Sequence, residues 1–171
     1  MSGRPLAVLL AAIVFLAGGT GCTGNVNLTE ALEITDVLTG WYDNGVTADG
    51  KNHLLPTITF RVKNKTARPL SSVELDTAFW QDGADGENDS VLVRAIGGEA
   101  LAAGASTEPL TVRAPHGYVL EGARADFFNN SGFKDFTVKL FGKRGGRIFR
   151  LGEYKVERRI IPQAQRAPDR P

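Results

Sequence analysis

The sequence predicts an all-β protein built as one two-sheet sandwich of about eight strands. Apolar and polar residues alternate along 57–63 and again along 73–80, as they do in strands with one buried face. Turn-forming Gly, Asn, Asp and Pro residues recur at intervals of about 8 to 12 residues. After position 21, no stretch of about 12 residues has the apolar spacing of a helix. The 171 residues, of which 42% are hydrophobic, fit a single domain with its own core.

The first predicted strand lies at residues 32–42. Leu32 and Ile34 alternate with polar neighbours, and a change of phase at Asp36 predicts a β-bulge before the aromatic pair at 41–42. An Asp-Asn-Gly sequence then ends this strand. The segment from there to residue 52 is poor in apolar residues, which predicts a loop or a weak edge hairpin.

The two central strands are joined by a polar connection of six residues, 64–69, that ends at a proline. Because hairpins favour two-residue turns, this longer connection predicts an arch between the two sheets. The alternation directs Phe60 and Phe79 to the core, and it directs Arg61 and Trp80 to solvent.

Apolar residues between turn signals predict three further strands, at 91–95, 107–114 and 119–128. The clearest hairpin follows, because Phe136, Val138 and Leu140 alternate with outward-facing residues. A turn at 143–146 then leads into a last strand at 147–161.

The N-terminus has the three regions of an export signal. Arg4 precedes an apolar run at 6–17, and small residues fill 18–21. The run has 12 residues, whereas crossing a bilayer core takes about 20. The sequence therefore predicts a cleaved signal peptide at residues 1–21 and no stable transmembrane helix.

Cys22 is the only cysteine and follows these small residues directly, so the chain has no internal disulfide. This arrangement resembles the lipobox of bacterial lipoproteins, in which the thiol is acylated and becomes the first mature residue. The resemblance implies a lipid anchor at Cys22, a lipidated tether at 22–30, the folded domain at 31–161 and a disordered tail at 162–171. An ordinary secretory signal with an incidental cysteine is the alternative. Thr23, in place of Asp, suggests the outer membrane where a cell has two.

Four short stretches share features of one domain family, at residues 60–66 (FRVKNKT), 69–75 (PLSSVEL), 78–83 (AFWQDG) and 101–106 (LAAGAS). They resemble the FxLYD-type immunoglobulin-like domains of prokaryotic surface proteins and lipoproteins. Those domains share a V-x-N-x-T turn, an aromatic-rich strand and an L-x-P-G connection. The resemblance implies an immunoglobulin-like envelope module without known catalysis.

Charge is unevenly distributed along the chain, although the formal net charge is only +1. Residues 22–129 contain 8 Lys and Arg against 15 Asp and Glu, a net charge of −7, and residues 130–171 contain 11 against 4, a net charge of +7. The hairpin tip with Lys143, Arg144 and Arg147 has no evident packing reason to be so basic. We therefore expect these residues to contact any anionic lipid, lipopolysaccharide or glycan partner. A solvated edge that resists aggregation is the alternative.

Two other groups of residues are weaker candidates for a site. Trp41, Tyr42 and Trp80 are candidates for an exposed aromatic contact surface, with core cover as the favoured alternative. The acidic turn offers carboxylates of the kind that bind calcium, although their spacing fits no EF-hand: Asp82, Asp85, Glu87 and Asp89. Solvation of the turn is the alternative, and we expect no metal there.

The inventory of catalytic groups is thin. His53 and His116 have no neighbouring partner for a metal site or a catalytic triad. No G-x-S-x-G sequence or glycine-rich phosphate loop is present. We therefore expect neither an enzyme nor a bound cofactor.

These observations together predict a membrane-anchored lipoprotein of a bacterial cell envelope, with a non-catalytic binding or structural domain. One alternative is an accessory subunit of an envelope complex, which would present an exposed apolar patch. Another is a module that binds an anionic lipid, lipopolysaccharide or glycan through the basic hairpin. A nucleic acid is not an expected partner of an exported, anchored chain.

Overall fold

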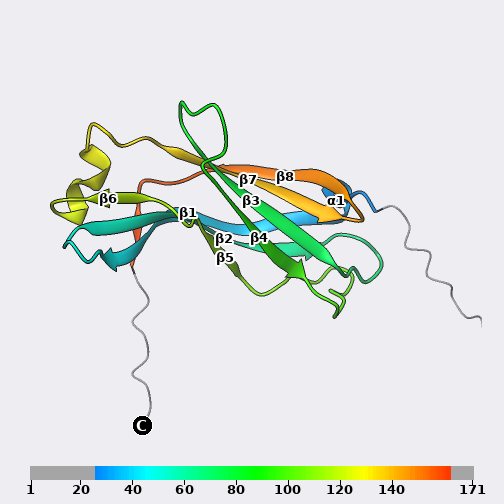
Figure 1. The fold of residues 1–171 in the computed structure, drawn as a ribbon. Coiled ribbons are helices and arrows are strands. Elements are labelled where there is room, and N and C mark those ends of the chain that lie inside the picture. The colour runs from blue at the N-terminus through cyan, green and yellow to red at the C-terminus, as the bar shows by residue number, and fades with distance from the viewer. Residues whose placement is uncertain (1–25, 163–171) are drawn as a thin grey trace, which may run out of the picture.

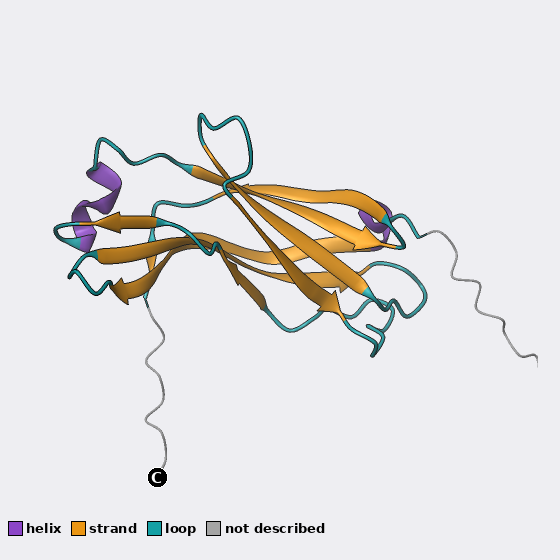
Figure 2. Ribbon diagram, viewed as in Figure 1, coloured by secondary structure: helices purple, strands orange, loops and turns teal. Residues whose placement is uncertain are grey.

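The computed structural model describes residues 26–162. The predicted signal peptide, Cys22 and nearly all of the predicted tail lie outside the described residues. The described chain forms two β-sheets packed face to face (Figure 1), which confirms the prediction of an all-β sandwich. The short helices lie at opposite ends of this sandwich (Figure 2).

One sheet has five strands, with β2 and β1 at its centre. Its members are β1 (Leu32–Val46), β2 (Asn52–Asn64), β5 (Leu110–Arg113), β6 (Tyr118–Leu120) and β9 (Ile160–Ile161). Both β5 and β6 pair with β2, each along a different part of it, so they form one interrupted edge. The short β9 pairs in parallel with β1 on the other side.

The second sheet has four antiparallel strands in the order β4-β3-β7-β8. These strands are β3 (Val73–Gln81), β4 (Asp89–Ile96), β7 (Phe136–Arg144) and β8 (Arg147–Lys155). The chain crosses between the sheets from β2 to β3, which confirms the predicted arch. Strands one, two and five share one sheet, and strands three and four pair with the last hairpin in the other, as in an immunoglobulin-like sandwich.

The buried Asn64 holds this arch together. Its side-chain amide donates to three backbone oxygens, those of Arg68, Leu101 and Ala102, over 2.9–3.1 Å. Its carbonyl oxygen accepts from the backbone N–H of Thr66 at 3.0 Å. A fully buried amide is stable only with such partners, so Asn64 fixes the path of the chain between the sheets.

The predicted bulge in β1 is confirmed. The register with β2 shifts between Thr35 and Leu38, and Asp36 has a φ of 52°. Beyond the aromatic pair the strand continues to Val46, further than predicted, and a turn at 47–51 leads directly into β2. The hairpin interpretation of this segment therefore holds.

The predicted inward residues form the core between the two sheets. Phe60, Phe79, Val138 and Leu140 have no exposed surface, whereas Arg61 keeps a third of its side chain in solvent. The alternation read from the sequence therefore gives the correct faces of β2, β3 and β7.

Three predicted segment boundaries are wrong. A short helix, α1 (Leu28–Ala31), occupies the end of the predicted tether and buries Leu28 completely, so the domain begins before residue 31. The predicted strand at 119–128 ends after β6 and gives way to the 3₁₀-helix η1 (Arg124–Asn129), because Gly122 has a φ of +93° and Phe127 turns into the core. The predicted last strand breaks after β8, where Val156 is buried as the chain crosses to the other sheet.

Candidate functional site

An open groove of about 560 Å³ lies where the β7–β8 turn meets the end of β4. The strand register explains its position, because Glu74 of β3 pairs with Arg94 of β4 on one side and with Lys143 of β7 on the other. Two glycine pairs, at 97–98 and 145–146, line the groove without side chains and so leave it hollow. The second pair forms the two-residue hairpin turn, with φ values of 54° and 76° that suit glycine.

Three cations line this groove, and two of them also bond to the protein. Lys143 donates to the Asp76 carboxylate at 2.6 Å, and Arg144 donates through Nη1 to the Ser71 carbonyl at 2.9 Å. The third, Arg94, has an exposed side chain. The expectation that the tip has no structural reason to be basic is therefore wrong for Lys143 and Arg144.

The ion pair beneath the groove perturbs Asp76. Partial burial raises the pKa of the Asp76 carboxyl, but hydrogen bonds from Lys143 and Ser90 and the charge of Lys143 outweigh it. The net result is a pKa below the ordinary value of an aspartate. Asp76 thus stays ionised at neutral pH and offsets much of the Lys143 charge.

The two guanidinium groups of the groove keep free hydrogen-bond donors. Within residues 26–162, no carboxylate lies within 4.0 Å of Arg94 or Arg144. Among the described residues of the lining, Glu74 is the one carboxylate. A guanidinium presents five donors in a planar fork that matches the oxygens of a phosphate or carboxylate. The groove is therefore suited to an anionic group.

Arg147 lies next to this groove, outside its lining. Its side chain is exposed, and its guanidinium carbon is 5.5 Å from the centre of the Phe149 ring. Of the three predicted anion-contacting residues, the structure places Lys143 and Arg144 in the groove with Arg147 beside them. Sequence reasoning missed Arg94, because its position depends on the pairing of β3 with β4.

Trp41 lies in the core, as the favoured alternative predicted, and not on an aromatic contact surface. This side chain has no exposed surface, because Trp41 pairs with Pro56 on the inner face of its sheet. Its ring centre lies 5.0–5.5 Å from four other aromatic rings, those of Tyr118, Phe127, Phe133 and Phe136. Trp41 is the centre of an aromatic cluster in the core.

Tyr42 and Trp80 do not form a joint surface either. They lie on the outer faces of different sheets, one next to the inward Trp41 and the other next to the inward Phe79. Each ring is covered by a cation: the Arg113 guanidinium carbon is 3.6 Å from the Tyr42 ring centre, and Lys139 Nζ is 3.7 Å from the Trp80 ring centre. Both aromatics therefore pack under local cations.

The carboxylates of the acidic turn do not converge. Asp82, Asp85 and Glu87 are exposed, whereas Asp89 is nearly buried and lies 2.7 Å from His116 Nδ1. In the described part of the chain, no three His, Cys, Asp or Glu side chains are grouped as a metal site would require. The solvated-turn interpretation fits the first three residues, and Asp89 holds the loop of His116.

The other histidine of the sequence, His53, forms one side-chain hydrogen bond within the described residues. Its Nδ1 lies 3.0 Å from Asn44 Nδ2. Neither histidine forms a hydrogen bond with a serine, threonine or cysteine of residues 26–162. The structure thus groups neither histidine with a nucleophile there.

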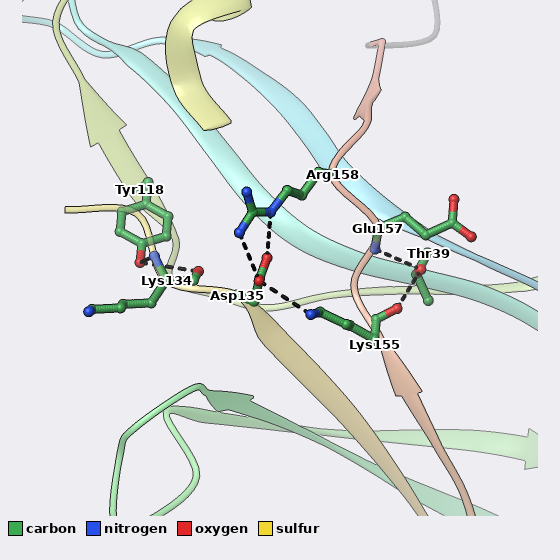
Figure 3. Close-up of polar contacts among 7 residues, drawn as sticks. All are labelled: Thr39, Tyr118, Lys134, Asp135, Lys155, Glu157 and Arg158. Atoms are coloured by element: carbon green, nitrogen blue, oxygen red, sulfur yellow. Dashed lines mark hydrogen bonds and ion pairs between the residues drawn. The ribbon is translucent and has the colours of Figure 1, made fainter. Parts of the chain in front are cut away.

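A second polar cluster, which sequence reasoning missed, joins the start of β7 to the segment between β8 and β9 (Figure 3). Arg158 donates two hydrogen bonds to Asp135 at 2.9 Å, and Lys155 Nζ is 3.3 Å from the same carboxylate. The hydrogen bonds from Arg158 hold the pKa of Asp135 below its ordinary value, against the opposing effect of burial and with further help from Lys155. Thr39 bonds the backbone of Lys155 and Glu157, so the cluster fastens the crossing chain to β1.

Comparisons with protein-family models and with curated proteins gave no match for this chain. Of the helices in the described part, none is long and apolar enough to cross a membrane. A functional proposal therefore rests on the groove, on the sandwich fold, and on the N-terminal sequence that lies outside the described residues.

Proposed function

We propose that this protein is a lipid-anchored lipoprotein of a bacterial cell envelope, whose sandwich domain is a non-catalytic binding or structural module. The observation that carries the proposal is the position of Cys22, directly after the small residues of an export signal and six residues before the buried Leu28. Six residues span at most about 20 Å. A lipid at Cys22 would therefore hold the folded domain close to a membrane surface.

The proposal includes membership of the FxLYD-type immunoglobulin-like domains. Its support is the arch, where the V-x-N-x-T sequence forms a closed turn: the Asn64 carbonyl oxygen accepts from both the backbone N–H and the hydroxyl of Thr66, at 3.0 and 2.8 Å. The strand connectivity is also that of an immunoglobulin-like sandwich.

Binding of an anionic group is favoured over docking through an apolar patch. Among residues 26–162, the large exposed apolar side chains are spread over four strands of both sheets, at Leu38, Val46, Leu92, Val119 and Ile148. The groove, in contrast, gathers three cations in one hollow. This composition supports recognition of a phosphate- or carboxylate-bearing partner such as a lipid, lipopolysaccharide or glycan.

Metabolic labelling tests the anchor. Cells that express the full chain are grown with labelled palmitate, and their inner and outer membranes are separated. Wild-type protein should carry the label and sediment with the outer membrane of a two-membrane cell, and Thr23→Ala should still carry the label because its thiol is intact. Cys22→Ala should be unlabelled and soluble. Equal membrane retention of Cys22→Ala would refute the proposal.

A further inference from the structure

The start of the described chain and the basic groove lie at the same end of the sandwich (Figure 1). Helix α1 packs against β8, and Thr29 Oγ1 donates to the Arg150 carbonyl at 3.5 Å. A Cβ on Gly142, the residue before Lys143, would lie 2.8 Å from Leu28 Cδ1. The chain that comes from Cys22 therefore enters the fold beside the β7–β8 turn.

Other turns meet at this same end. The Lys65 N–H of the β2–β3 arch donates to the Ala31 carbonyl at 2.8 Å, and the loop after β4 bonds to the arch between Leu70 and Leu101. We call the combination of α1, the arch, the loop after β4 and the β7–β8 turn the α1 end. It thus gathers four segments of the chain at the end of the sandwich where the groove lies.

The α1 end carries more cations than carboxylates. Its cations are Lys65, Arg68, Arg94, Lys143, Arg144 and Arg147. Opposite charges come from Asp76, which pairs with Lys143, and from four further carboxylates: Glu30, Glu74, Glu99 and Glu108. Most of these cations are exposed, and they lie in the arch or near the ends of β4, β7 and β8, where they can approach a charged surface directly.

The acidic turn lies at the other end of the same sheet. Gln81, the last residue of β3, pairs with Phe136 at the start of β7, whereas Glu74 pairs with Lys143 near its end. Strand β3 has nine residues, so the two ends are separated by roughly 26 Å. Asp82, Asp85 and Glu87 project there without a bonded cation in the described part. An anionic surface would attract the α1 end and repel this one.

One exposed apolar side chain accompanies the cations. Ile148 is 65% exposed and is the cross-strand partner of Lys143, so both lie on the outer face beside the turn. A cation next to an exposed isoleucine has the two properties that a bilayer interface favours, charge for the headgroups and an apolar group for the layer below them.

We propose that the α1 end lies against the bilayer that holds the Cys22 anchor, with Arg94 and Arg144 binding the phosphate of an anionic lipid headgroup. The groove, of about 560 Å³, is large enough for such a headgroup. In this arrangement Ile148 meets the interface and the acidic turn points away from the membrane. The inference rests on the proposed function only for the presence of the anchor.

The lipid anchor at Cys22 and the basic groove reinforce each other in binding the membrane. A tether of six residues keeps Leu28 within about 20 Å of the acylated Cys22, and Leu28 lies beside the β7–β8 hairpin that lines the groove. The headgroup concentration at the groove is therefore high even when the affinity of the groove is low. The groove in turn restricts the rotation of the domain on its tether. The domain would then present one fixed end to the envelope.

Vesicle co-sedimentation tests the surface independently of the anchor. The full mature chain carries Cys22→Ser, so no acyl group contributes, and it is mixed with phosphatidylcholine vesicles that contain or lack phosphatidylglycerol. Binding should require the anionic lipid and should weaken as salt rises, because charges are screened over about 8 Å at physiological salt.

Two double variants decide the question, because each removes two cations, the first variant from the α1 end and the second from elsewhere on the domain. Arg94→Gln with Arg147→Gln changes side chains that have no ion pair within residues 26–162, and it should weaken binding about tenfold. Lys134→Gln with Arg113→Gln removes the same charge away from the α1 end and should change binding less than about twofold. Circular dichroism checks that both variants are folded.

Three results would overturn the inference: no binding to anionic vesicles, an equal loss in both double variants, or binding of inorganic phosphate without binding of vesicles. The palmitate experiment distinguishes the two proposals. Vesicle binding by a chain whose Cys22 proves unacylated supports the surface and overturns only the anchor, whereas acylation without vesicle binding overturns only the surface.

Discussion

Packing of α1 against the β7–β8 hairpin can be tested by a double-mutant cycle of Leu28 and Gly142. Leu28 is fully buried, and its replacement by alanine leaves a cavity between α1 and β8. Such changes cost about 2–5 kcal/mol, depending on how far the site collapses. Because α1 is four residues long and near the end of the domain, it can partly relax, so we expect the lower part of this range, about 2–3 kcal/mol.

The opposite change, Gly142→Ala, overfills the same space. A Cβ at Gly142 would lie 2.8 Å from Leu28 Cδ1 and 3.0 Å from Leu151 Cδ1, and neither contact is acceptable without movement. Overpacking of this kind costs about 1–3 kcal/mol. When Gly142→Ala is combined with Leu28→Ala, the cavity left by Leu28 receives the new methyl group. The double variant should therefore lose about 1 kcal/mol less stability than the sum of the two single losses.

Urea unfolding of the mature chain with Cys22→Ser, followed by tryptophan fluorescence, measures these free energies. Thr29→Ala is the control, because its side chain is exposed and its bond to the Arg150 carbonyl is long, at 3.5 Å, so it should contribute less than about 0.5 kcal/mol. A Leu28→Ala effect as small as that of Thr29→Ala would show that α1 is not packed. Additivity of the two changes would show that Leu28 does not contact Gly142.

Two further predictions concern the core and the second polar cluster. Trp41→Ala should destabilise the domain by about 3–5 kcal/mol in urea unfolding, because Trp41 is fully buried among four rings. Tyr42→Ala, on the outer face, should destabilise it by much less. Equal effects would place Trp41 at the surface. Asp135→Asn should cost about 1 kcal/mol at neutral pH. The folded-state pKa of Asp135 lies below its unfolded value, so its contribution is present above about pH 4 and is lost as the pH falls further. The stability difference between wild type and Asp135→Asn should therefore shrink in acid, and a difference that grows there would contradict the pairing with Arg158.

The faces of the main strands could be predicted because each strand alternates along its own sequence. Phe60, Phe79 and Val138 are buried as the pattern requires, and the long connection after Asn64 correctly indicates an arch. Helix α1 could not be predicted in this way, because four residues are too few to show a helical period.

The site was less accessible to sequence reasoning because its parts are far apart in the chain. Lys143 and Arg144 stand out as a basic turn, but Arg94 joins them only through the pairing of β4, β3 and β7. The burial of Trp41 likewise depends on aromatic residues that follow almost 80 positions later, beginning with Tyr118. Local sequence patterns therefore predict that the β7–β8 turn is basic, whereas the groove can be predicted only when the strand order is known.

The most direct test of the central claim, that an anchored domain holds its α1 end against a membrane, uses the single cysteine of the chain. Wild type, Ile148→Cys and Glu87→Cys are displayed on membranes as the acylated protein and treated with a maleimide that cannot enter the bilayer. We expect no labelling of the wild type, fast labelling of Glu87→Cys in the acidic turn, and slow labelling of Ile148→Cys that becomes fast when the membrane is dissolved in detergent. Labelling of the wild type would contradict the anchor, and equally fast labelling of the two introduced cysteines on intact membranes would contradict the orientation.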